Sequence, residues 1–231
     1  MKQILQIKYH FKFHKAGYIH FTIKLNSESL VYKRADTPNL PEWTRLENHQ
    51  CSNCPLDVKK HPYCPIAVNL SDIIDKFSDC ISYTEVNVRV DSPDRIYIKD
   101  TTIHEALSSL IGIIMVTSGC PIMDILRPMV RFHLPFSNIE ETIFRSVGSY
   151  LIMQYFKNAN GKAPDWELKL LINAYEKIQI VNNGMAKRLY SVSKSDANAN
   201  AVVILDMLAK ELPYSILENL KELQYLYQDF I

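Results

Sequence analysis

The sequence predicts an α+β fold in which an N-terminal antiparallel sheet of about four to five strands packs on a C-terminal helical bundle of about five helices. Three observations predict this class. Apolar and polar residues alternate near the N-terminus, as they do in strands with one buried face. After Lys99 the apolar residues recur at helical spacing. The chain has 231 residues, 47% of them hydrophobic, which is enough for one sizeable core.

The first predicted elements are the strands of a hairpin, residues 4–13 and 18–25, joined by a turn at 14–17. One face of this hairpin is apolar and is expected to be buried: Ile7, Tyr9, Phe11, Phe13, Ile19, Phe21, Ile23 and Leu25. The other face is basic and carries two histidines: Lys8, His10, Lys12, His20 and Lys24. A shorter strand at 29–34 and a second hairpin at 82–90 and 95–99 would complete the sheet.

The predicted organisation is a mostly β region, residues 1–100, followed by a helical region, residues 101–231, within one compact domain. The β region contains a long proline-rich loop at 36–65. A loop of that length usually has a function or a local cross-link, because ordering it costs conformational entropy.

Three helices are expected around and after this loop. A short helix at 69–80 has Asn69 or Ser71 as its cap. A longer helix at 101–116 begins at a threonine and stops before Gly119. A further helix at 120–132 starts at Pro121 and breaks at Pro128.

Four more helices are predicted at 137–156, 165–181, 199–212 and 216–230. Ser137 and Glu140 have the spacing of a capping box for the first of these. Asp165 would cap the second, and Pro213 would end the third. Within the first, Glu141 and Arg145 stand four residues apart and are expected to pair.

The segment "HQCSNCPLDVKKHPYCP", residues 49–65, carries the chemistry that the sequence offers. It holds three of the five cysteines and two of the seven histidines. Thiolates in a Cys-x-x-Cys pair can share one metal. We therefore predict a metal site of Cys51, Cys54, Cys64 and Cys120, with His49, His61 and His133 as alternative ligands. The metal is a zinc ion or an iron–sulfur cluster, and four protein ligands favour a structural role. The simplest alternative is that the thiols bind no metal.

Several short motifs resemble known metal sites. Residues 51–64, taken with His61 as a ligand, resemble the zinc knuckle in ligand types and total span, with a different internal spacing. Proline follows Cys54, Cys64 and Cys120, which resembles the Cys-Pro step of bacterial ferredoxins. The Cys-x-x-Cys-Pro, Tyr-Cys-Pro and Ser-Gly-Cys-Pro motifs together resemble uncharacterised bacterial proteins, and this resemblance implies a linked cysteine set without an activity.

These features predict a metal-binding sensor, adaptor or regulatory domain rather than a turnover enzyme. We expect it in the cytoplasm, because no secretory signal is visible and the most apolar stretch, residues 106–116, is too short to span a membrane. Its partner would be another protein or a second copy bound through the helical region.

Two other functions stay open at this stage. One is a redox or thiol-dependent enzyme that uses the cluster or Cys120, whose pKa a helix start would lower, with His133 as the base. The other is a nucleic-acid-binding module that uses the basic hairpin face. Against the second, the net charge is only +1, and the hairpin's alternating aromatic residues fall on the opposite face.

Overall fold

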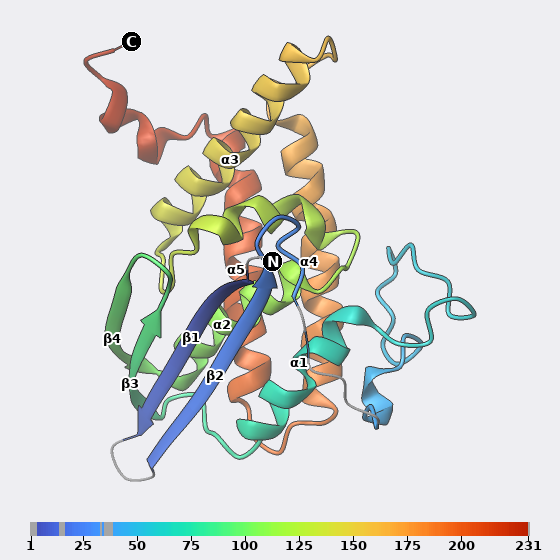
Figure 1. Cartoon of the computed structure of the whole chain (residues 1–231). Helices are drawn as coiled ribbons and strands as arrows, with labels where there is room; N and C mark the ends of the chain where they lie inside the picture. The colour runs from blue at the N-terminus through green and yellow to red at the C-terminus, as the bar shows by residue number, and fades with distance from the viewer. Residues whose placement is uncertain (1–3, 14–16, 33, 35–38, 231) are drawn as a thin grey trace.

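The computed structural model describes residues 4–13, 17–32, 34 and 39–230, and it has the predicted α+β fold (Figure 1). Its sheet has the strand order β2-β1-β3-β4, with neighbouring strands antiparallel. The strands are β1 (Ile4–Phe13), β2 (Gly17–Asn26), β3 (Glu85–Asp91) and β4 (Ile96–Thr102). Both predicted hairpins are therefore confirmed, although residues 14–16 of the first turn lie outside the described residues.

The prediction of a third strand at 29–34 is wrong for the residues described there, 29–32 and 34. Only Tyr32 pairs there, through an isolated bridge to Leu25. The backbone N–H of Tyr32 donates to the Thr117 carbonyl, 2.9 Å away, so this segment turns from the sheet toward a helix end.

Some helical elements lie between the two hairpins in sequence, and the others follow the second hairpin. In chain order, the helical elements are η1 (Glu42–Thr44), α1 (Pro65–Lys76), α2 (Ile103–Thr117), η2 (Met123–Phe132), α3 (Ile139–Ala159), α4 (Lys169–Tyr190), α5 (Ala197–Leu217) and η3 (Lys221–Tyr227). Figure 1 shows α2 and α5 behind the sheet. Helix α5 packs against both α2 and α4, and α1 packs against α2. No helix in the described ranges is both long and apolar enough to cross a membrane.

One continuous hydrophobic core joins the sheet to the helices. Tyr9, Phe11 and Val88 on the inner face of the sheet are completely buried. The rings of Phe11 and Phe77 meet edge to face at 4.9 Å, which connects β1 to the end of α1. The alternation in the first hairpin is thus confirmed, because one face of each strand meets these helices while the other meets water.

The helix boundaries differ from the predicted ones at their N-terminal ends. Helix α1 begins at Pro65, with Cys64 as its N-cap, because proline suits the first helical position. The capping box of α3 consists of Asn138 and Glu141, one residue later than predicted. Helix α4 begins after Leu168, whose φ of 61° interrupts helical geometry.

Proline also acts differently from the prediction in two elements. Residues 123–132 form a 3-10 helix that continues through Pro128, not an α-helix broken there. Pro213 lies inside α5, which runs on to Leu217. The predicted last helix shortens to η3, in which only Leu223 is buried. A single proline removes one backbone donor, and tertiary contacts decide whether the helix survives that loss.

Candidate metal centre

The cysteine-rich loop is ordered by a short antiparallel contact between its two ends. The N–H of Leu46 donates to the Pro62 carbonyl at 2.9 Å, and the N–H of Cys64 donates to the Thr44 carbonyl at 2.8 Å. Between these ends, the N–H of Cys54 donates to the Cys51 carbonyl at 3.0 Å and forms a tight turn. Both residues of the Cys-x-x-Cys pair, at the two ends of this turn, line the same cavity.

The other two cysteines come from helix boundaries. Cys64 is the residue directly before α1. Cys120 follows α2, where Gly119 has a φ of 86° and reverses the chain. The side chain of Asn69 on α1 donates to the Ser118 carbonyl at 3.4 Å, which holds these two boundaries together.

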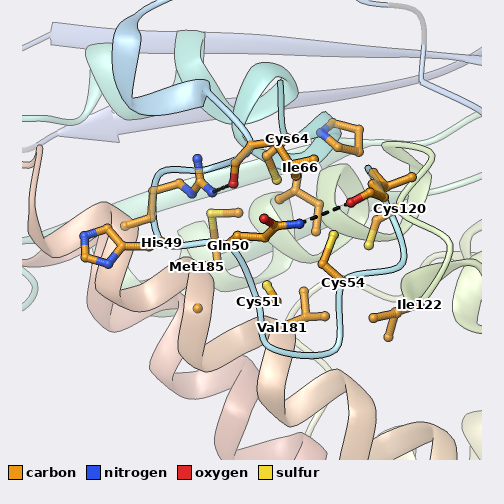
Figure 2. A pocket seen from close by; sticks show the side chains of 15 residues that line it. His49, Gln50, Cys51, Cys54, Cys64, Ile66, Cys120, Ile122, Val181 and Met185 are labelled. Carbon is orange, nitrogen blue, oxygen red and sulfur yellow. Dashed lines mark hydrogen bonds between the residues drawn. The ribbon is translucent and has the colours of Figure 1, made fainter. Parts of the chain in front are cut away.

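The sulfur-bearing side chains of Cys51, Cys54, Cys64 and Cys120 line one cavity beside α4 (Figure 2). We call it the cysteine cavity. Its volume is about 20 Å³, which is room for about one water molecule. Most of its other walls are apolar: Leu46, Leu56, Ile66, Ile122, Val181 and Met185. Three separate parts of the chain therefore bring four thiols to one small, largely apolar space.

Helix α4 has a glycine where Cys51 approaches it. A Cβ atom at Gly184 would stand 2.8 Å from the sulfur of Cys51, a distance that side chains do not tolerate. The backbone of α4 can therefore approach the sulfur closely only because residue 184 has no side chain.

The cysteine cavity also has a buried cation. Arg188, one turn after Gly184, is 2% exposed. Its Nη1 donates to the carbonyls of Trp43 and Arg45, both at 2.6 Å, and its Nη2 donates to the Leu46 carbonyl at 3.4 Å. Burial lowers the pKa of Arg188, whereas the nearby thiols Cys64, Cys51 and Cys54 raise it. Among the described residues it forms no ion pair with a carboxylate.

The thiols influence one another, as closely spaced groups do. Burial raises the pKa of Cys51 to about 11, and the neighbouring Cys64, Cys54 and Cys120 add to this rise. Burial likewise raises the pKa of Cys120, although backbone N–H groups of Met123 and Ile122 act against the rise. The predicted lowering of the Cys120 pKa is therefore wrong, because burial outweighs the effect of the backbone dipoles.

The three alternative histidine ligands do not join the thiols. His49 borders the cavity, but its ring points away from the sulfurs (Figure 2). His61 is exposed and does not line the cavity. The Nε2 atom of His133 lies 2.7 Å from the hydroxyl of Tyr9, outside the cysteine cavity. His133 is thus not placed to act as a base for Cys120.

The four thiols surround a space without forming a ready site for a single ion. In the part of the chain that the structure describes, no group of three or more His, Cys, Asp or Glu side chains has the geometry of a metal-ion site. The fifth thiol, Cys80, lies outside the cavity, next to Asp79.

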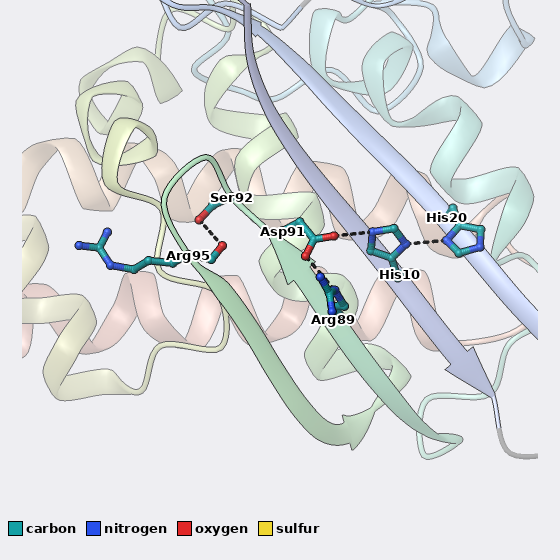
Figure 3. Close-up of polar contacts among 6 residues, drawn as sticks. All are labelled: His10, His20, Arg89, Asp91, Ser92 and Arg95. Atoms are coloured by element: carbon teal, nitrogen blue, oxygen red, sulfur yellow. Dashed lines mark hydrogen bonds and ion pairs between the residues drawn. The ribbon is translucent and has the colours of Figure 1, made fainter.

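The basic hairpin face, the other predicted site, forms the outer face of the sheet (Figure 3). His10 lies between His20 and Asp91. The Nδ1 atoms of the two histidines are 2.8 Å apart, and Nε2 of His10 is 2.9 Å from Oδ2 of Asp91. Arg89 also donates to Asp91, at 2.8 Å. Of the five basic residues predicted on this face, His10 is therefore already paired with an acid, which leaves fewer of them for phosphates.

Sequence reasoning found the four cysteines but missed Gly184 and Arg188. One signal was available for Arg188, because it comes near the end of an amphipathic helix, but basic residues are common there. No sequence signal marks Gly184, because the thiol of Cys51 becomes its neighbour only when the chain folds.

Comparison with known proteins places the chain in a family. No curated protein and no solved structure matches it. The model of a domain of unknown function, DUF6901, matches residues 7–228, which includes nearly all of the sheet, all four cavity cysteines and α4. Since this match covers nearly the whole chain, the protein belongs to the DUF6901 family.

Proposed function

We propose that Cys51, Cys54, Cys64 and Cys120 bind one metal centre and that the protein is a cytoplasmic sensor or regulatory domain controlled by the state of that centre. The observation that carries the proposal is the arrangement at the cysteine cavity. Four thiols from three parts of the chain face one space, and a buried arginine without a carboxylate partner among the described residues lies beside them.

The charge of Arg188 supports an anionic occupant. A buried guanidinium is costly unless an opposite charge compensates it. Four thiolates around a zinc ion, or around a cluster of the same charge, leave a net charge of about −2. A thiolate-ligated centre would thus compensate Arg188, whereas four protonated thiols would not.

A zinc ion and an iron–sulfur cluster can each take four thiolate ligands, and they differ in the ligand spacing that they need. Zinc–sulfur bonds of about 2.3 Å place tetrahedral thiolates roughly 3.8 Å apart. A cluster holds its ligands further apart, because an iron atom stands before each thiolate and bridging sulfides separate the irons. Backbone N–H groups directed at the sulfur of Cys120 would stabilise a thiolate ligand of either centre.

A centre at this position would connect separate elements. It would hold the loop that contains Cys51 and Cys54 against α1, α4 and the segment after α2. Loss or oxidation of the centre would free this loop and change the surface around it. This is the behaviour expected of a sensor, and it needs no substrate.

The test is metal and sulfide analysis of the full chain purified without oxygen, together with its visible absorbance. We expect metal bound by the four thiolates, with iron, acid-labile sulfide and a brown colour for a cluster, or one equivalent of zinc and no colour for a single ion. Serine at any of the four positions 51, 54, 64 or 120 should remove most of the metal. Cys80→Ser is the matched control, since Cys80 lies outside the cavity, and it should retain the metal.

Other results have distinct meanings. One equivalent of zinc that depends on all four cysteines would support the site and assign zinc to it. Metal that survives Cys120→Ser but is lost in His61→Ala would contradict the four-cysteine set. A folded, metal-free protein with five reactive thiols would overturn the proposal.

A further inference from the structure

A second hollow lies between helices α2, η2 and α5 and the start of α3, and it shares no residue with the cysteine cavity. We call it the helix hollow. Its volume is about 790 Å³, within the range of small-molecule sites. Much of its wall is aliphatic, including Ile113, Leu126, Met129, Leu134, Leu205 and Leu208. An occupant must therefore present substantial apolar surface.

Arg145, on the first turns of α3, lines the helix hollow. Its Nη2 donates to the carbonyls of Met129 and Phe132, both at 3.1 Å. Its Nε and Nη1 make no hydrogen bond to described residues, and it has no ion pair with a described carboxylate. Glu141, the partner that helical spacing predicts, instead accepts a hydrogen bond from the N–H of Asn138. Arg145 thus keeps donors and charge available for an anion.

His133 also lines the helix hollow. Tyr9 is completely buried, and His133 is its hydrogen-bond partner. The hydroxyl of Tyr9 must donate to Nε2 of His133, because its proton would otherwise be buried without an acceptor. The remaining ring nitrogen, Nδ1, then carries the N–H.

The acids that border the helix hollow do not occupy Arg145. Glu105 accepts a hydrogen bond from the hydroxyl of Thr101, and Glu140 accepts one from the hydroxyl of Tyr225, 2.7 Å away. Glu211 is exposed on α5. None of these carboxylates forms an ion pair with Arg145, although each keeps its negative charge, and Lys99 adds a second cation to the wall of the hollow.

From these contacts we infer that the helix hollow binds an amphipathic organic carboxylate. The carboxylate meets Arg145 in a charge-assisted pair, and the aliphatic chain lies along α2 and α5. The inference does not depend on the metal centre, because the two sites have separate walls.

The test is calorimetric titration of the full chain with sodium decanoate below its micelle-forming concentration, with 1-decanol as the uncharged comparison. We expect saturable binding of one decanoate per chain and much weaker binding of decanol. Arg145→Gln should weaken decanoate binding about tenfold or more. Arg131→Gln, the matched control, removes an exposed charge that does not line the hollow and should leave binding unchanged.

A second variant tests the same inference if Arg145→Gln fails to fold. Met207 lines the hollow but is 63% exposed, so Met207→Asp should fold. It should also weaken decanoate binding, because it places an acid beside the ligand. Unsaturable binding, equal binding of decanol, or equal losses in Arg145→Gln and Arg131→Gln would overturn the inference.

Discussion

Arg188 and Arg145 are residues of one kind, cations that donate to loop carbonyls and have no carboxylate partner among the described residues. Burial lowers the pKa of each. Each faces a cavity in which an anion would restore the balance of charge. Neither role follows from sequence spacing, which for Arg145 predicts a surface pair with Glu141.

The first prediction concerns the glycine beside Cys51. Replacing a glycine inside a helix by alanine normally stabilises a protein by about 0.5–1 kcal/mol. For Gly184→Ala we expect no such gain and a lower metal content per chain, because the new Cβ meets the sulfur at 2.8 Å. Thermal unfolding and metal analysis measure both effects.

Gly148→Ala is the matched control for this prediction. Gly148 lies inside α3 and has open space where a Cβ would stand, so the usual gain in stability is expected. Should Gly184→Ala be as stable as Gly148→Ala and fully loaded with metal, Cys51 would not occupy a fixed ligand position.

A further residue-scale prediction concerns pH. Burial, with a smaller contribution from Arg145, lowers the pKa of His133 to about 3, well below the value of about 6.5 in an unfolded chain. Below pH 6.5 the unfolded chain therefore takes up a proton that the folded chain refuses. The free energy of unfolding should fall as the pH drops from 6.5 toward 3, by at most about 1.4 kcal/mol per pH unit from this group.

Urea unfolding at pH 7 and pH 5 measures this effect. In His133→Gln the decrease in stability between the two pH values should be smaller than in the wild-type protein. The comparison uses the difference between pH values, because the substitution also alters the hydrogen bond to Tyr9. An identical decrease in both proteins would contradict the prediction.

At the scale of elements, the strands were predicted better than the helix ends. Alternation over 4–13 depends on the two-residue period of a strand and on one buried face, and both are local properties. Helix ends depend on competing signals a few residues apart. Asp165 illustrates this, because its carboxylate accepts from the N–H of Leu170 at 2.8 Å although α4 begins only at Lys169.

The cysteine-rich loop gives a prediction at the same scale. Backbone hydrogen bonds join its two ends at residues 44–46 and 62–64, and those between the ends are local turns, at Cys51–Cys54 and Asp57–His61. Removing the metal with a chelator should therefore increase amide hydrogen exchange at 47–61 and 118–122. The strands β1 and β2 should stay protected, since their ladder and buried face do not involve the cavity. Hydrogen-exchange mass spectrometry resolves these segments, and unchanged exchange in the loop would show that the metal does not order it.

At the scale of the whole molecule, the continuous core argues against separate β and helical domains. We expect calorimetric unfolding in a single transition whose measured and van't Hoff enthalpies agree. Phe11→Ala should destabilise the protein by about 3–5 kcal/mol and shift the single transition without splitting it, because Phe11 joins β1 to Phe77.

The control for this prediction is Phe230→Ala. Phe230 is 82% exposed, so its removal should change stability by no more than about 0.5 kcal/mol. Two separate transitions in Phe11→Ala would show that the sheet and the helices fold independently.

The sequence by itself determined the fold class, the buried face of the first hairpin and the cysteines worth considering. Strand alternation, helical periodicity and the chemistry of each residue type can all be read from neighbouring residues in the sequence. Only the tertiary structure decided which distant residues meet. Cys120 and Arg188 lie far along the chain from Cys51, and they share a cavity with it because α2, α4 and the loop pack on one core. His61 stands nearer to Cys51 in sequence but lies outside that cavity. Residues that are close in sequence determine local turns, whereas the packing of helices, strands and loops determines which residues form a site.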